Sequence, residues 1–102
     1  MIAQFDVYEN INTSSKKDMP FLLDVQNDIL DELNSRIVVP LSINSKPAKI
    51  LNPIFTINSQ NLIMSTAQLS SIPIKNIGIK VCSLKHKRDE IISAVDFLIT
   101  GY

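Results

Sequence analysis

The spacing of apolar residues changes once along the chain, near Leu84, and this change limits the fold more than any other feature. Before Leu84, apolar and polar residues alternate in several segments, which is typical of strands with one buried face. After it, a spacing of about 3.6 residues is typical of an amphipathic helix. That spacing is kept by Leu84, Ile91, Val95 and Leu98. The sequence therefore predicts a mainly β fold with one C-terminal α-helix.

The expected strands can be placed from this alternation and from the turn residues between them. They are residues 2–8, 21–26, 37–43, 54–57, 62–65 and 77–81. In the first strand we expect Phe5 and Val7 to face the core while Asp6 and Tyr8 face the other way. Pro40 has no amide donor, so we expect it at a sheet edge or a bulge. The polar segment 9–18 predicts a long, mobile loop.

Other segments carry local signals of their own. Residues 27–34 set apolar side chains among acids and are compatible with a wide bend or a helical turn. Ser83 is the expected N-cap of the helix, because its hydroxyl can accept a hydrogen bond from a free backbone amide of the first turn. Phe97 is expected to point away from the core. Gly101 is expected to leave the helix with a positive φ angle, which would direct Tyr102 toward solvent or a partner.

Composition limits the functional classes. With 102 residues the chain is expected to form a single domain, 1–102. Ten basic and ten acidic residues give zero net charge, which argues against direct binding of bare nucleic acid or an anionic membrane. Cys82 is the single cysteine, which excludes an intrachain disulfide and favours a reducing compartment. With no signal peptide or membrane span in the sequence, we expect a cytoplasmic location.

The sequence offers little for catalysis. His86 and Cys82 are too few for a tetrahedral zinc site, so no metal and no cofactor are expected. They stand four apart and could form a thiol–imidazole pair, but a buried, inert Cys82 is the better interpretation. No glycine-rich phosphate loop and no GxSxG, HExxH or CxxC motif occurs. The basic run 85–88 indicates a solvated helix start, with nucleic-acid contact as the lesser alternative. We therefore expect no enzyme and no catalytic residues.

Several short runs, taken in order, form a combination that spans nearly the whole chain. They are Gln4-Phe5-x-Val7-Tyr8, Asp24-Val25-Gln26-x-Asp28-Ile29-x-Asp31, Arg36-x-Val38-x-Pro40-Leu41, Ser71-Ile72-Pro73-Ile74, Ile77-Gly78, Leu84-x-His86 and Asp89 to Gly101. In these runs the chain resembles the CcdB family, the toxins of plasmid and chromosomal toxin–antitoxin modules. The resemblance implies an SH3-like barrel or bent antiparallel sheet of about five strands with a C-terminal helix, assembled as a two-fold homodimer.

The resemblance also implies a mechanism. Such a toxin binds the gyrase A protein of DNA gyrase, traps the enzyme on cleaved DNA and breaks no bond itself. Any contact with DNA is then indirect, through gyrase or the antitoxin complex. The residues that match the gyrase-contacting positions are Asn27, Ile29, Leu30, Asp96, Ile99, Thr100, Gly101 and Tyr102. The best-known member of the family has Trp where this chain has Thr100, which removes a typical hot-spot anchor.

The antitoxin of such modules is of the CcdA type, a disordered segment that folds on the toxin. By position, the resemblance implies that the antitoxin binds the first loop and nearby strand edges. The candidate antitoxin-binding residues are Tyr8, Asn10, Ser42 and Asn44. Two other functions stay open. A barrel-fold endoribonuclease toxin could use His86, Arg36 and Arg88, although zero net charge counts against it. A non-toxic homologue would still dimerise and bind antitoxin.

Overall fold

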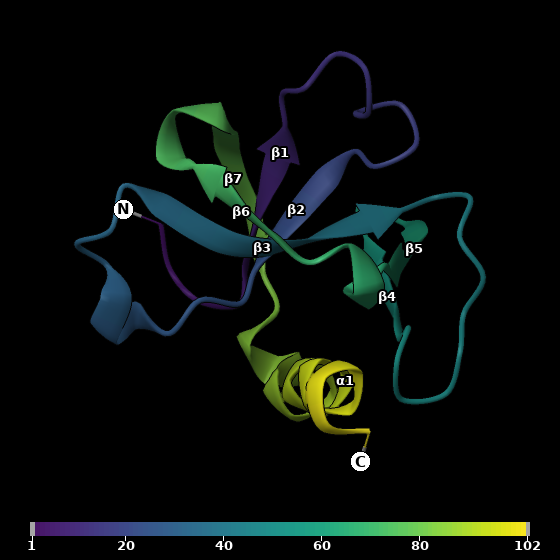
Figure 1. Ribbon diagram of the computed structural model, residues 1–102. Coiled ribbons are helices and arrows are strands. Elements are labelled where there is room, and N and C mark those ends of the chain that lie inside the picture. The colour runs from purple at the N-terminus through teal and green to yellow at the C-terminus, as the bar shows by residue number, and fades with distance from the viewer. Residues whose placement is uncertain (1, 102) are drawn as a thin grey trace.

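A computed structural model describes residues 2–101 as a curled antiparallel sheet with one helix beneath it (Figure 1). The strands are β1 (Asp6–Asn10), β2 (Phe21–Asp24), β3 (Ser35–Ser42), β4 (Ile54–Ile57), β5 (Gln60–Met64), β6 (Ser70–Pro73) and β7 (Ile77–Ser83). The helix is α1 (Arg88–Thr100), and the short 3-10 turns are η1 (Asp28–Leu30), η2 (Thr66–Gln68), η3 (Ile74–Asn76) and η4 (Lys85–Lys87). This confirms the predicted mainly β fold with a C-terminal helix.

The central strand β3 holds the sheet together because it has three partners. The strand order is β4-β5-β3-β2-β1-β7, and β6 also pairs with β3. Along one edge of β3, residues 35–38 pair with β6 and residues 41–42 pair with β5. Pro40 lies between these two pairings, and its carbonyl accepts the Ser65 amide at 2.9 Å. The structure thus places Pro40 inside the sheet at a change of partner, and not at the edge or bulge that the sequence suggested.

The sheet curls where the chain passes from β6 to β7, because these two consecutive strands pair with different strands of the sheet. β6 pairs with β3, η3 follows directly, and β7 then pairs with β1 (Figure 1). The result is the half-barrel that the family resemblance implied, with seven strands in the described residues where about five were expected. The predicted hairpin between β4 and β5 is also confirmed. Its turn is Asn58 and Ser59 and not the four-residue link 58–61, and both residues have positive φ, as a type I′ turn requires.

One face of the sheet packs against α1 and is apolar. We call this the helix-side core. Side chains of the alternate strand positions meet Leu84, Ile91 and Ala94 there, so burial of hydrocarbon drives the docking of the helix. It also contains Phe5, just before β1, and from the strands Val7, Leu23, Val39, Leu41, Phe55, Ile57, Leu62 and Met64.

The opposite face of β1, β2 and β3 is also buried, and it carries charge. We call it the barrel-side core. Because successive side chains of a strand point to opposite faces, the residues that alternate with the helix-side core lie here. They are Asp6, Tyr8, Leu22, Asp24, Arg36 and Val38, all buried. The sequence interpretation of β1 as a strand with one buried face was therefore wrong, because the curl of the sheet encloses both faces.

The start of β1 also differs from the prediction. The strand begins at Asp6 and not at residue 2, because Phe5 has a φ of +70°, a left-handed conformation that interrupts extended structure. Phe5 is nevertheless well anchored. Its amide donates to the Asp24 carbonyl at 2.7 Å, and its carbonyl accepts the Leu84 amide at 2.7 Å. This single residue therefore ties β1 both to the end of β2 and to the segment that leads into α1.

The helix begins later and buries less than its spacing predicted. The 3-10 turn η4 precedes α1, and the N-cap position of α1 is Lys87, so the prediction of Ser83 as the N-cap was wrong. The Ser83 hydroxyl instead accepts the Lys85 amide at 3.2 Å at the start of η4. Ile91 and Ala94 are fully buried, whereas Leu98 is exposed and Phe97, predicted to point outward, is half-buried. Residues 98–100 at the end of α1 are thus exposed, whereas Val95 still packs against the helix-side core. None of the helices in the described residues is long and apolar enough to cross a membrane.

Candidate partner-binding surfaces

The C-terminal end of α1 is one candidate surface. Asp96, Ile99, Thr100 and Gly101 are all exposed, and Ile99 retains 72% of its accessible area. The Thr100 hydroxyl donates to the Asp96 carbonyl at 2.7 Å. Gly101 has the predicted positive φ, +80°, and its amide donates to the Phe97 carbonyl at 3.0 Å. Tyr102 lies outside the described residues.

The electrostatics of this helix end favour a cationic partner group. Asp96 lies near the end of α1, where the free carbonyls of a helix carry partial negative charge. Within the described part of the chain, the last turn of α1 contains no basic residue to balance that charge. The surroundings of Gly101 are open, since a Cβ placed there would meet no atom within 4 Å. An approaching surface therefore finds an apolar side chain, a carboxylate and room for close contact.

The turn η1 is the second candidate surface, and it was one of the two conformations expected for residues 27–34. Asn27 caps it, because the side-chain oxygen accepts the Ile29 amide at 3.0 Å. Ile29 keeps 84% of its area accessible, and Leu30 and Leu33 are exposed beside it. Among residues 2–101, no large apolar side chain is more exposed than Ile29.

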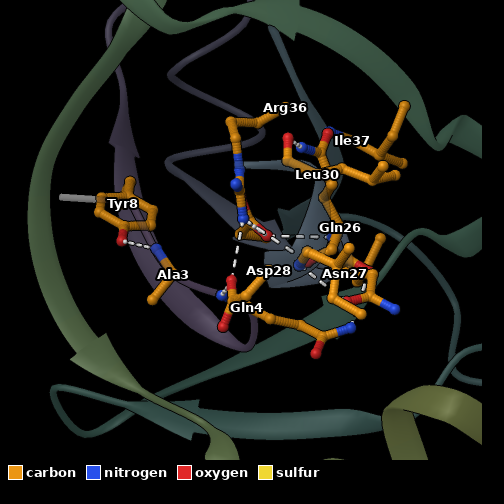
Figure 2. A network of polar contacts seen from close by, with 12 residues as sticks. Ala3, Gln4, Tyr8, Gln26, Asn27, Asp28, Leu30, Arg36 and Ile37 are labelled. Atoms are coloured by element: carbon orange, nitrogen blue, oxygen red, sulfur yellow. Dashed lines mark hydrogen bonds and ion pairs between the residues drawn. The ribbon is translucent and has the colours of Figure 1, made fainter. Parts of the chain in front are cut away.

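A buried ion pair lies next to η1, and Figure 2 shows its arginine, Arg36, beside Asp28. The Arg36 guanidinium donates twice to the Asp24 carboxylate, from Nε to Oδ2 at 2.6 Å and from Nη2 to Oδ1 at 2.9 Å. The two side chains are 1% and 0% exposed. The hydrogen bonds from Arg36 to Asp24 raise the pKa of the guanidinium above its usual value. Arg36 therefore stays charged, and in this bidentate geometry the charges of Arg36 and Asp24 compensate each other inside the barrel.

The ion pair is connected to both ends of η1. At the first end, Arg36 Nη2 lies 3.4 Å from the Asp28 carboxylate, which also accepts the Gln4 amide at 2.8 Å. At the other end, the Gln26 side-chain amide donates to the Leu30 carbonyl at 2.9 Å. Figure 2 shows these contacts converging on η1 from the strands. Ile29 therefore projects from a turn that buried groups hold on both sides.

The two candidate surfaces do not meet within the chain. Figure 1 draws the short blue turn of η1 to the left of the sheet and the end of α1 at the bottom, clearly separated in that view.

A family model described as "CcdB protein" matches residues 4–101, nearly the whole chain. The chain belongs to the CcdB family. It is therefore a toxin of a toxin–antitoxin system, with a cognate antitoxin as its partner.

Solved structures share the CcdB fold of this chain. The Mycobacterium tuberculosis toxin MazF-mt6 matches with a TM-score of 0.67 at 13% identity, over 76% of this chain and 83% of that one. An endoribonuclease in complex with its cognate antitoxin from a mycobacterial species matches with a TM-score of 0.77 at 10% identity, over 97% and 95% of the two chains. At such identities the likeness shows the fold alone.

Three of the four residues proposed to bind the antitoxin of this CcdB protein are buried. The Tyr8 hydroxyl accepts a backbone amide inside the barrel, and burial raises its pKa. Asn10 donates its side-chain amide to the first loop, and the Ser42 hydroxyl shares a hydrogen bond with Ser65 at 2.7 Å. Only Asn44 is exposed, and it donates to Asp18 at 3.1 Å. In this conformation Asn44 is directly open to an antitoxin, whereas Tyr8 and Ser42 are covered.

The same region contains a groove that the sequence did not reveal. A cavity of about 650 Å³ lies between the first loop and β6. Its walls combine apolar and amide side chains, including Asn10, Ile11, Met19, Leu22, Ile72 and Asn76. These residues come from segments far apart along the chain, so local sequence patterns could not group them.

The structure also places the residues considered for catalysis. Cys82 is half-buried, and burial raises its pKa, so the thiol stays protonated and poorly nucleophilic. His86 and Arg88 are exposed near the start of α1, but Arg36 is sealed inside the barrel by Asp24. The interpretation of Arg36 as a catalytic candidate was therefore wrong. Among residues 2–101, no three His, Cys, Asp or Glu side chains are grouped so that they could hold a metal ion.

Proposed function

We propose that this CcdB-family toxin binds the gyrase A protein of DNA gyrase and traps the gyrase–DNA cleavage complex, and that its protein antitoxin neutralises it. The toxin performs no chemistry in this proposal. It acts by preferential affinity for one state of gyrase, which accumulates that state.

One observation carries the proposal: Ile29 and Ile99 are both largely exposed, although each lies on an ordered element. Exposed aliphatic groups gain free energy when a partner covers them, about 25 cal/mol for each Å² of apolar surface. Both residues match positions that the family uses against gyrase. A solvated polar surface would give no such gain, so this arrangement supports a protein partner.

The full proposed contact set includes both surfaces. It consists of Asn27, Ile29, Leu30, Asp96, Ile99, Thr100, Gly101 and Tyr102. Because η1 and the end of α1 are apart in one protomer, we propose a two-fold homodimer that presents each surface twice. Two linked contacts raise the effective concentration of the second one, which increases the overall affinity without new residues.

Thr100 changes the character of the contact. Its hydroxyl is already bonded to the Asp96 carbonyl, so mainly its methyl group is available to gyrase. That group is far smaller than the Trp of the best-known family member. In this proposal Ile99, with 72% of its area accessible, supplies the principal apolar anchor at the helix end.

The antitoxin is proposed to bind at the groove between the first loop and β6. Asn44 and the amide side chains of the groove can pair with the backbone of an extended segment, while Ile11 and Ile72 cover its apolar side chains. Tyr8 and Ser42 then shape this region from within, whereas the Asn10 side chain lines the groove itself.

The deciding experiment adds the purified toxin to gyrase, supercoiled plasmid and ATP, and traps covalent gyrase–DNA complexes with denaturant. The full chain is compared with a variant that lacks Thr100 to Tyr102. We expect linear DNA with the full chain and much less with the variant. Absence of both cleavage and supercoiling inhibition at large molar excess over gyrase would contradict the proposal, and undisturbed growth on induced expression would then favour a non-toxic homologue.

An endoribonuclease is the competing function, because solved structures of the same fold include one. The burial of Arg36 removes one of its three candidate residues and leaves His86 and Arg88. A ribonuclease would cleave RNA directly, lose that activity in His86→Ala, and tolerate loss of the last three residues. A gyrase poison shows the opposite pattern in both variants.

A further inference from the structure

Ile29 is 84% exposed, yet it lies on a turn that buried groups hold at both ends. We propose that Arg36 is a positioning residue, which acts through Asp24, Gln26 and Asp28 to hold η1 so that Ile29 projects as a preformed contact for gyrase. This inference rests on the proposed function and assigns a role to residues that the gyrase contact set does not include.

The N-terminal end of η1 is held through a carboxylate. Asp28 is the first residue of the turn, and its carboxylate is bound by Arg36 at 3.4 Å and by the Gln4 amide at 2.8 Å. The Asp28 side chain is about half exposed, so it bridges the buried guanidinium and the surface.

The C-terminal end of η1 is held through a buried amide. The Gln26 side chain makes one bond in each direction, donating to the Leu30 carbonyl at 2.9 Å and accepting the Ile37 amide from β3 at 3.0 Å. The Gln26 backbone is fixed as well, because its amide donates to the Asp24 carboxylate at 3.0 Å. The end of η1 is thereby tied to the central strand of the sheet.

The chemistry of arginine suits the centre of this network. The guanidinium is planar, so Nε and Nη2 can bind the two oxygens of Asp24 side by side, while Nη2 also faces Asp28 and the Gln26 carbonyl. A buried ion pair is a poor source of stability, because desolvation offsets its attraction. It can instead define one conformation, and here the conformation it defines is that of η1.

Preformed geometry increases affinity because the partner need not order the segment during binding. Loosening η1 without touching Ile29 should therefore weaken gyrase binding. Asp28→Ala does this with little risk to the fold, since its side chain is half exposed and the Asp24–Arg36 pair remains. Glu32→Ala is the matched control, because it removes the same charge from the same segment and Glu32 makes no side-chain bond in the described residues.

The test is a double-mutant cycle for binding to purified gyrase A with Asp28→Ala and Ile29→Ala. We expect Asp28→Ala to weaken binding about tenfold in the wild-type background and less than about twofold when Ile29 is already absent. Equal losses in the two backgrounds would overturn the proposal, because they would show that Asp28 acts on gyrase independently of Ile29. Thermal unfolding of each variant confirms that all are folded.

A second measurement follows the turn itself in the free protein. The Leu30 amide donates to the Asn27 carbonyl at 2.9 Å, so its hydrogen exchange reports the order of η1. We expect about tenfold faster exchange in Asp28→Ala and no change in Glu32→Ala. Unchanged exchange in Asp28→Ala would overturn the positioning role.

Failure of gyrase binding and failure of positioning give different results. Wild-type toxin that does not bind gyrase A contradicts the proposed function and, with it, this purpose for the network. Wild-type binding that Asp28→Ala leaves intact contradicts the positioning role alone.

Discussion

The two cores of this toxin are both buried, but different interactions hold them together. The helix-side core is made of hydrocarbon side chains, whose burial is favourable in any arrangement that excludes water. The barrel-side core depends on directional bonds such as those between Arg36 and Asp24, which are satisfied in one geometry only. Stability and local shape can therefore come from opposite faces of one sheet.

The largest expected effect tests the barrel-side core. Arg36→Ala leaves the Asp24 carboxylate buried without its partner, so we expect it to lower the free energy of unfolding by about 3–5 kcal/mol. Urea denaturation monitored by circular dichroism measures this loss. A much smaller loss would show that water enters the barrel and that the two cores differ less than their geometry indicates.

A paired replacement separates the charge of the barrel-side core from its volume. Asp24→Leu combined with Arg36→Met removes both charges together and fills the space with hydrocarbon. We expect this double variant to recover most of the stability lost in Arg36→Ala, because apolar replacement of a buried ion pair is often neutral. Hydrogen exchange at the Leu30 amide should nevertheless be faster in this double variant than in the wild type. Slow exchange at Leu30 in this variant would mean that η1 is ordered without the ion pair.

The next effect tests the helix-side core. Ile91 is fully buried between α1 and the sheet, so Ile91→Ala leaves a cavity and should cost about 3 kcal/mol. The matched control is Ile99→Ala on the same helix, where exposure predicts a change within about 0.5 kcal/mol. Denaturant titration compares the two. Equal effects would mean that the end of α1 is packed against something in solution.

A smaller effect is expected from Tyr8. Its hydroxyl accepts the Ala3 amide at 2.9 Å, so Tyr8→Phe should cost about 1 kcal/mol near neutral pH. Burial raises the pKa of Tyr8 in the folded protein. The contribution of this group is therefore complete below the ordinary tyrosine pKa of about 10 and is lost as pH rises through the raised value. Unfolding measured at several pH values should show a steeper alkaline loss in the wild type than in Tyr8→Phe.

The smallest effect on stability is expected from Ile29→Ala, within about 0.5 kcal/mol, because the side chain is in solvent. Its effect on gyrase A binding should be about tenfold, since an exposed anchor matters only when it is covered. Calorimetric titration with gyrase A, alongside thermal unfolding, measures both quantities. Unchanged binding would remove η1 from the proposed contact set.

Local patterns predicted the features that depend on neighbouring residues. The change of spacing near Leu84 identified the helix, and the polar link before residue 62 identified the hairpin. Gly101 takes its positive φ because it lacks the Cβ that opposes this conformation. The family followed from motifs that cover nearly the whole chain. These features need no knowledge of which strands meet in space.

The barrel-side core could not be predicted in this way. Asp24 and Arg36 are twelve residues apart and look like outward-facing polar positions of alternating strands. They are buried because β6 and β7 curl around that face, a long-range event with no local signal. The same cause buries Tyr8, which the family resemblance assigned to the antitoxin. The gyrase contact set remains a prediction.

Pro40 has a consequence for misfolding. A strand that slips by one residue turns every side chain to the opposite face, which in β3 would exchange Arg36 and Val38 with Val39 and Leu41. In the native register the Pro40 nitrogen faces the gap between β5 and β6, where no donor is needed. After a slip it would face β2 and leave a carbonyl there without a donor. Pro40 thus disfavours a one-residue register slip of β3, which would exchange the side chains of the helix-side and barrel-side cores.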